Sequence, residues 1–239
     1  MADKTIVVEN VKKTYGTVQA IKGVSFSICE GQVVGLIGDN GAGKSTLMKM
    51  MTHIILPDTG NIFFGEVNLS NDYDKALLKI GANLGGGMLI TKRTGYENLC
   101  MRIDALQLQM IKKEILEEVC ELFELSEFWY KKCEKCSVGM QQRIARAMAF
   151  AGKPQWIILD EPFNGLDPSS VKMALNAIRK VAKKGTAVII SSHLLYDIEK
   201  ICDRALVLSK GTLLANKEVT EIVEKYNSIE NFYFEIIEG

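Results

Sequence analysis

The sequence predicts an α/β fold in which both ends of the chain build one core and a helical lobe is inserted between them. Strand-like runs alternate with helical runs, as in folds built around a mostly parallel sheet. Two runs, 156–159 and 187–190, are wholly apolar, which is typical of strands buried on both faces. We expect a single domain over 1–239, with its core at 1–85 and 152–239 and its helical lobe at 86–151.

The first quarter of the chain is expected to supply several strands and one helix. The predicted strands are 5–9, 23–29, 32–37 and 61–64. A turn at 30–31 joins the second of these to the third, and residues 44–52 favour a helix. A glycine-rich segment therefore lies between a predicted strand and a predicted helix.

That glycine-rich segment has the form GxxxxGK[ST], which is typical of a phosphate-binding loop. Its glycines would let backbone N–H groups curl around phosphate oxygens, and the helix N-terminus would add partial positive charge. Lys44 would reach the β- and γ-phosphates, and the Ser45 hydroxyl would bind Mg²⁺. A chance glycine turn is the alternative, and the strand–loop–helix order disfavours it. We expect nucleotide contacts from Gly38, Asp39, Asn40, Gly41, Ala42, Gly43, Lys44, Ser45 and Thr46.

A second motif follows the apolar run 156–159, where two carboxylates, Asp160 and Glu161, stand before a proline. In a phosphate-loop protein the first carboxylate holds Mg²⁺, usually through water. The second can polarise an attacking water molecule. A strand that ends in Asp-Glu is common, so this interpretation depends on the phosphate loop that precedes it.

The middle of the chain differs from the two ends that build the core. Gly85, Gly86 and Gly87 predict a flexible joint, and residues 96–150 are mostly helical. Near the C-terminus, the runs 205–208 and 212–215 flank a Lys-Gly pair and predict a β-hairpin.

Composition and charge exclude several classes of protein. Hydrophobic residues make up 47% and charged residues 24%, which is ordinary for a soluble globular chain. Lys+Arg and Asp+Glu are both 29, so the basic excess of a nucleic-acid binder is missing and no nucleic-acid partner is expected. No apolar run approaches the roughly 20 residues of a membrane span, and no signal peptide is predicted, so we expect a cytoplasmic chain. Cys133 and Cys136 form a lone CxxC, which favours unrelated thiols over a metal site.

Four further segments resemble those of one family. Residues 136–143, Cys-Ser-Val-Gly-Met-Gln-Gln-Arg, are similar to the signature LSGGQxQR of ABC transporter ATPases. Residues 164–167, Asn-Gly-Leu-Asp, resemble that family's D-loop, and Ser-Ser-His at 191–193 resembles its switch histidine after an apolar strand. Tyr15 stands where the family has an aromatic that stacks on adenine. In their order and spacing, these segments make nearly the whole chain resemble the nucleotide-binding subunit of an ABC transporter.

The resemblance implies a phosphate-loop NTPase core of the ABC ATPase type, with an N-terminal antiparallel β portion and an inserted helical lobe. It implies an ATPase that uses ATP and Mg²⁺, with Lys44, Glu161 and His193 as catalytic residues. Ser45 and Asp160 would hold Mg²⁺, Asp160 through water. In this family the signature of one subunit closes the ATP held by another. Ser137, Gly139 and Met140 would therefore face a partner's ATP, beside Asp167 of the D-loop.

The same resemblance implies two protein partners. One is a second ABC ATPase subunit, in a homodimer or a heterodimer, and the other is a polytopic membrane permease. The chain would then sit on the inner face of the cell membrane through that permease.

Several of these residues also have plain structural explanations. Ser137 can cap the helix that begins at Val138, and Gly139 can be a flexible helix start. Asp167 before Pro168 is a good N-cap for a helix over 169–183. His193 can be a core histidine at a strand end, and Tyr15 can be a packed surface aromatic.

Three departures from the family pattern bear on activity. Cys136, Val138 and Met140 replace the usual leucine, glycine and glutamine of the signature. The family glutamine near the lobe junction, which helps to place Mg²⁺ and water, aligns with Gly85. Export ATPases of the bacitracin and lantibiotic type carry an acidic residue there, and they share the Ile-Gly-Ala at 80–82 and the Glu-Asn-Leu at 97–99.

Two functions therefore remain open. The favoured one is the ATP-hydrolysing subunit of an ABC exporter, because Glu161 and His193 are both present. The alternative is a regulatory ATP-binding subunit that hydrolyses little and completes a partner's site. A soluble ABC protein acting on ribosomes or DNA is disfavoured, because the chain holds one such domain and no sustained heptad run.

Overall fold

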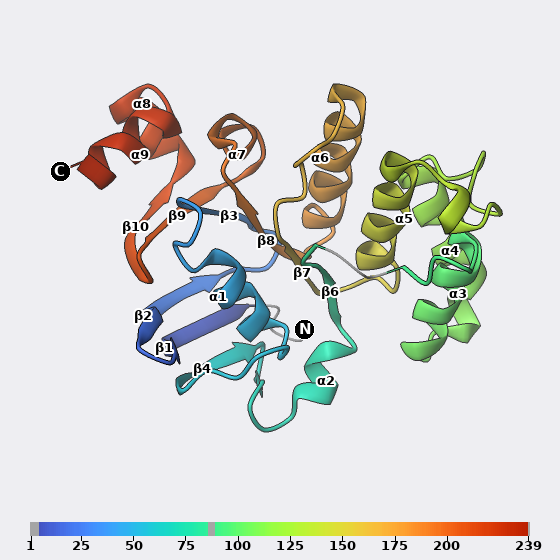
Figure 1. Cartoon of the computed structure of the whole chain (residues 1–239), viewed down its shortest axis with the longest axis horizontal. Coiled ribbons are helices and arrows are strands. Elements are labelled where there is room, and N and C mark those ends of the chain that lie inside the picture. Colours follow the sequence, from blue (N-terminus) through green and yellow to red (C-terminus); the bar gives the residue numbers. More distant parts are fainter. Residues whose placement is uncertain (1–4, 86–88, 239) are drawn as a thin grey trace.

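The computed structural model, which describes residues 5–85 and 89–238, confirms the α/β fold (Figure 1). The strand order of its larger sheet is β10 (Thr212–Glu218), β9 (Arg204–Ser209), β3 (Val33–Ile37), β8 (Ala187–Ser192), β7 (Trp156–Leu159) and β6 (Ile80–Asn83). Neighbouring strands are parallel except for the C-terminal hairpin of β9 and β10, which confirms the predicted hairpin. The two wholly apolar runs form β7 and most of β8, and both are buried throughout.

The smaller sheet is antiparallel, as the family resemblance implies. Its strand order is β2 (Val18–Ile28), β1 (Ile6–Tyr15), β4 (Thr59–Phe64) and β5 (Val67–Asn68). The predictions 5–9 and 23–29 for β1 and β2 are too short, because pairing continues past an irregularity at Asn10. Asn10 has a φ of 46°, and its N–H donates to the Ser25 hydroxyl at 2.8 Å instead of to the ladder. A β-bulge of this kind lets a polar stretch continue as strand.

Two apolar layers hold the core together, one on each face of the larger sheet. Val34 and Leu36 of β3 face the smaller sheet, while Val33 and Ile37 face the other side. Helix α1 (Lys44–Met51), predicted at 44–52, buries Leu47, Met48, Met50 and Met51 in the layer between the two sheets. The loop before α1 is therefore anchored by a buried strand at one end and a buried helix at the other.

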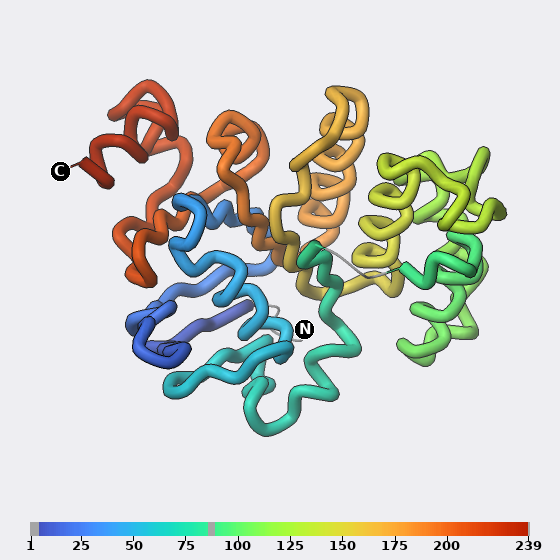
Figure 2. The backbone as a smooth tube through the Cα atoms, in the orientation of Figure 1, coloured from blue at the N-terminus to red at the C-terminus, as the bar shows by residue number. Residues whose placement is uncertain are grey.

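The helices α3 (Gly95–Ala105), α4 (Lys112–Leu122) and α5 (Val138–Phe150) gather at one side of the molecule, beside β6 (Figures 1 and 2). Of the predicted joint, Gly86 and Gly87 lie outside the described residues, and Gly85 has a φ of +76°. The other helices are α2 (Tyr73–Leu77), α6 (Pro168–Ala182), α7 (Leu195–Ile201), α8 (Val219–Tyr226), α9 (Ile229–Glu238) and the 3₁₀ turns Gln109–Ile111 and Cys133–Lys135. Within the described ranges, none of the helices is long and apolar enough to cross a membrane.

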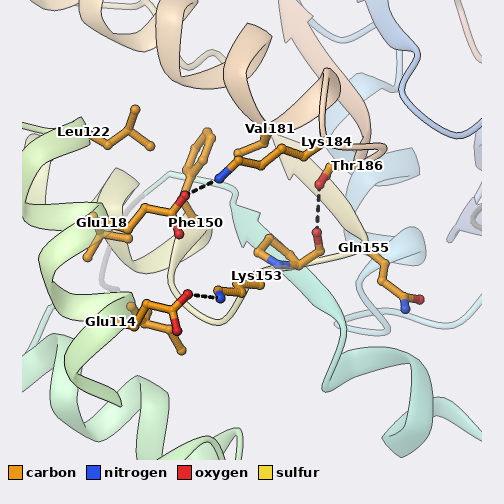
Figure 3. A pocket seen from close by; sticks show the side chains of 12 residues that line it. Glu114, Glu118, Leu122, Phe150, Lys153, Gln155, Val181, Lys184 and Thr186 are labelled. Carbon is orange, nitrogen blue, oxygen red and sulfur yellow. Dashed lines mark hydrogen bonds and ion pairs between the residues drawn. The ribbon is translucent and has the colours of Figure 1, made fainter. Parts of the chain in front are cut away.

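A cavity of about 570 Å³ separates α4 from the start of β7 and β8 (Figure 3). Two ion pairs cross it, one between Lys153 and Glu114 and one between Lys184 and Glu118, whose Nζ and Oε1 atoms are 2.6 Å apart. Because the glycine-rich loop follows the C-terminal end of β3, which is parallel to β7 and β8, this cavity lies at the opposite edge of the sheet. The two ion pairs thus tie α4 to the core at a distance from the phosphate loop.

We expect Lys184→Glu to lower the free energy of unfolding by about 0.2–1 kcal/mol, the range of partly exposed ion pairs. The double change Glu118→Lys with Lys184→Glu should regain part of that loss, because opposite charges face each other again while Lys180 and Lys153 remain near position 118. Urea unfolding measures both variants. The lysine lowers the pKa of Glu118, so the stabilisation is present above the ordinary value of 4.5 and is lost as the pH falls through the lowered value.

The matched control for this charge swap is Lys113→Glu with Glu117→Lys, a pair that lies within α4 alone. Its stability should not depend on how α4 meets the core. A swap at Glu118 and Lys184 that is as unstable as the single reversal would contradict an ion pair that stabilises the packing of α4.

Candidate active site

Three strand ends meet at one edge of the larger sheet. Strands β3, β8 and β7 are adjacent and parallel, with Ile37 beside Ser192 and Ile190 beside Leu159. The glycine-rich loop, the Asp160–Glu161 pair and His193 directly follow these ends. Segments that are far apart in the sequence are therefore neighbours, at the strand edge where α/β proteins bind ligands.

Close backbone packing requires two of the loop's glycines, Gly38 and Gly43. Gly43 has a φ of +110°, and a Cβ atom there would lie 2.7 Å from the Ala20 carbonyl oxygen. A Cβ atom at Gly38 would lie 2.1 Å from the Leu208 carbonyl oxygen. The loop is thus pressed against β2 and the β9–β10 hairpin, and the Gly211 N–H donates to the Ala42 carbonyl at 2.9 Å. Neither glycine has room for a larger side chain.

The start of α1 suits a phosphate group. Gly43 occupies the N-cap position, so no side chain caps the helix, and the first turn carries no acidic residue. Uncapped N–H groups and the helix dipole together favour an anion there. The Lys44 ammonium is buried inside the curve of the loop, where it donates to the carbonyls of Gly38 at 2.6 Å and Asp39 at 3.2 Å. Backbone donors and one buried cation therefore converge on the space in which phosphates would lie.

A serine connects the two carboxylates that follow β7. The buried Ser191 hydroxyl donates to Asp160 Oδ1 and accepts the Glu161 N–H at 2.9 Å. Asp160 is held with its carboxylate at the sheet edge, and Ser45 lies on the first turn of α1. Carboxylate and hydroxyl oxygens are the ligands that Mg²⁺ prefers, so these residues fit that ion.

Glu161 is paired with His193. Glu161 has a φ of +48°, a region that few residues other than glycine adopt. Its Oε2 atom lies 2.8 Å from His193 Nδ1, and both side chains are partly exposed. Backbone strain of this kind persists where the surroundings fix a functional geometry. The carboxylate and the imidazole form one unit that could orient and deprotonate a water molecule.

Gly85 lies beside the same carboxylates. With Asn83, Asp160 and Glu161 it lines a cavity of about 410 Å³, and nothing lies within 4 Å of the place where its Cβ atom would be. Gly85, which aligns with the family glutamine, therefore faces the same cavity as Asp160 and Glu161 but has no side chain that could contact them.

The signature residues line a different cavity from the one beside Asp160 and Glu161. Ser137, Gly139 and Met140 line a cavity of about 420 Å³ together with Asp167, and no residue of the phosphate loop lines it. Ser137 caps α5 as predicted, accepting the Met140 N–H at 3.3 Å. Gly139 has an ordinary helical backbone, and no atom lies within 4 Å of the place that a Cβ atom would take, so nothing in the described chain requires a glycine there.

Asp167 acts as a helix cap in this chain. Its carboxylate accepts the N–H groups of Ser169 and Ser170, both at 3.0 Å, and both serine hydroxyls. These contacts lower the pKa of Asp167 well below its usual range. Pro168 occupies the first helical position, so the predicted N-cap is confirmed and α6 begins one residue earlier than expected.

Tyr15 ends β1 and is about half exposed, with the Lys13 ammonium 5.7 Å from its ring centre. Cys133 and Cys136 are buried free thiols.

Sequence reasoning missed Ser191, although a hydroxyl at the end of an apolar strand was the available signal. It also missed Tyr233 of α9, whose hydroxyl contacts Asp39 and whose distance in sequence hid it.

The loop, the uncapped helix start and the paired carboxylates define a phosphate-loop nucleotide-binding protein. Comparison with known proteins narrows this class. A family model described as ABC transporter matches residues 21–164. The chain is 35% identical to the linearmycin resistance ATP-binding protein LnrL of Bacillus subtilis, over 91% of this chain and 70% of that protein. It is 32% identical to the bacitracin transport ATP-binding protein BcrA of Enterococcus faecalis, over 95% and 73% of the two chains.

One more relative and two solved structures support the same family. The lantibiotic transport ATP-binding protein SrtF of Streptococcus pyogenes is 32% identical over 88% of this chain and 90% of its own. A solved ATP-binding subunit of an ABC transporter superposes with a TM-score of 0.90 at 26% identity, covering 97% of this chain and 99% of the other. A solved dimeric bacterial ABC transporter cassette gives a TM-score of 0.80 at 25% identity, covering 90% and 98%.

The chain belongs to the ABC transporter ATP-binding proteins. It is an ATP-binding and ATP-hydrolysing subunit, and its relatives include the bacitracin and lantibiotic transport proteins that its motifs resemble.

Proposed function

We propose that this chain is the ATPase subunit of an exporter and that it closes its ATP site only with a second ABC ATPase subunit. One observation carries the second part of the proposal. The signature cavity contains no residue of the phosphate loop, which supports a site that the signature of a second subunit completes. The open space at Gly139 and the exposure of Val138, at 71%, leave room for a partner's nucleotide to approach. The second subunit can be another copy or a similar chain.

The geometry supports the following roles within one site. Lys44 and the loop N–H groups bind the phosphates, and Tyr15 stacks on adenine. Ser45 and Asp160 would hold Mg²⁺, which would neutralise phosphate charge when bound. Glu161 takes the proton of the attacking water while His193 orients it. Asp167 caps α6 and so positions the start of that helix toward the partner subunit.

The permease, the export direction and the location are inferred from the family. The relatives at 32–35% identity are named for bacitracin transport, lantibiotic transport and linearmycin resistance, which suits the removal of peptides and antibiotics from cells. We infer that residues 86–151 form the helical lobe and that the chain lies at the cytoplasmic face of the membrane through a polytopic permease. Affinity purification of the tagged chain from detergent-solubilised membranes should recover one integral membrane protein in fixed ratio. Recovery of the chain alone, or with ribosomes, would contradict the permease.

A regulatory subunit with little hydrolysis of its own is the second candidate. Val138, Met140 and Gly85 favour it, because each acts on the closed site and none on ATP capture. Valine is stiff where a glycine is usual, and methionine cannot donate the hydrogen bonds of a glutamine. We therefore expect near-normal ATP affinity but slow hydrolysis by the isolated chain, with a large rise when its partners order the interface.

The double change Val138→Gly with Met140→Gln should raise phosphate release by the isolated chain at least severalfold, because positioning can account for several kcal/mol of barrier. Steady-state phosphate release with and without the permease measures it. Met110→Gln, at a residue 98% exposed and outside the signature cavity, is the matched control and should change nothing. Rapid hydrolysis by the isolated wild type, unaltered by restoring the signature, would make these substitutions neutral.

A further inference from the structure

Helix α9 contacts the phosphate loop through Tyr233. Tyr233 of α9 donates its hydroxyl hydrogen to Asp39 Oδ1 at 2.7 Å, although the two residues are 194 positions apart. Asp39 is the second residue of the loop and is itself exposed, while Tyr233 is 7% exposed. A buried side chain therefore restrains a carboxylate on an exposed, anion-binding loop.

Tyr233 is held firmly enough to act as an anchor. The Ile229 N–H at the start of α9 donates to Glu199 Oε2 of α7 at 2.9 Å, and the Asn231 side chain donates to the Tyr226 carbonyl at 2.9 Å. Ile229 and Phe232 are buried in the core. Burial and the Asp39 carboxylate raise the pKa of Tyr233 to about 12, so the phenol remains a donor at neutral pH.

The Asp39 carboxylate would weaken ATP binding if it turned toward the nucleotide. Two residues of the same loop, Gly38 and Asp39, direct their carbonyls at Lys44, and the N-terminus of α1 lies at the other end of the loop. A negative charge that turned toward this space would repel the triphosphate and compete for the Lys44 ammonium. The hydrogen bond to Tyr233 fixes the carboxylate on the side of the loop that faces α9.

We propose that Tyr233 is a positioning residue for ATP binding, which holds the Asp39 carboxylate away from the nucleotide phosphates and couples α9 to the phosphate loop. The proposal rests on the loop being the ATP site. It predicts a residue that affects nucleotide affinity through Asp39 alone, without contacting the nucleotide itself.

Calorimetric ATP affinity of the full chain tests this in a double-mutant cycle. Tyr233→Phe keeps the ring and its packing, and it should weaken ATP binding about three- to tenfold at low salt, with a smaller effect in high salt, where charges are screened. The effect should be smaller for AMP, which carries less charge. In an Asp39→Asn background the same change should alter affinity less than twofold. Tyr226→Phe, on α8, is the matched control and should change affinity less than twofold.

Three outcomes separate the possibilities. A loss of affinity that is equal with aspartate and with asparagine at position 39 would make Tyr233 merely structural and overturn the proposal. Normal affinity in Tyr233→Phe, with binding still lost in Lys44→Ala, would also overturn it while leaving the ATP site intact. Unchanged affinity in Lys44→Ala would instead refute the ATP site on which the proposal rests.

Discussion

Lys44→Ala should weaken ATP binding by about ten- to a hundredfold, because it removes a charge-assisted contact worth roughly 1.5–3 kcal/mol. The Lys44 ammonium is buried in the curve of the loop, where its present partners are two backbone carbonyls. A phosphate is a stronger partner for this ammonium than either carbonyl, so the side chain is placed to turn toward a nucleotide. Isothermal titration with ATP measures the loss.

The matched control is Lys49→Ala, which removes an exposed lysine from the last turn of the same helix. Its ATP affinity should equal that of the wild type, which separates the position of the charge from the net charge of the chain. A folded Lys44→Ala variant that binds ATP as well as the wild type would refute the assignment of the loop.

The sequence predicts the parts of this site that are local in the chain. The apolar runs before Asp160 and Ser191 mark buried parallel strands, and the order of strand, glycine loop and helix marks the phosphate-binding edge. Asp167 before Pro168 marks a helix start. Each of these signals depends on neighbours within a few residues, and the structure confirms the elements themselves.

Contacts between distant segments could not be predicted in the same way. The bond from Tyr233 to Asp39 depends on how α9 docks, and no local pattern specifies that docking. The length of β1 was missed because a bulge at Asn10 breaks the apolar alternation without ending the strand. The strained backbone of Glu161 was missed for a similar reason, since it follows from the contacts with Ser191 and His193.

The signature departs from the family pattern without losing its local structure. Ser137 still caps α5, and the helix begins where the sequence places it. Val138 is exposed and contributes nothing to the core of this chain. The cost of the departures must therefore fall on an assembled site and not on the stability of the subunit, which is why hydrolysis by the isolated chain is the informative measurement.

Glu161→Gln should abolish turnover while leaving ATP bound. Glutamine has the shape of glutamate and can still accept a hydrogen bond from His193, so the substitution removes the charge and basicity of the group with little change in packing. Losing a general base typically costs about 10²–10⁴ in rate. Phosphate release measures this loss, and calorimetry should show ATP affinity within a few-fold of the wild type.

If each signature faces the nucleotide of the other chain, as proposed, unspent ATP should then hold two subunits together. Light scattering of the Glu161→Gln chain with Mg-ATP should therefore report a doubled mass, which falls back when ATP is replaced by ADP. Glu224→Gln, an exposed glutamate on α8, is the matched control and should hydrolyse normally without a lasting dimer. Wild-type turnover in Glu161→Gln would show that Glu161 is not the general base. Inactivity without a dimer would point to a heterologous partner, since a subunit that binds ATP but cannot pair with its own copy still has an incomplete site.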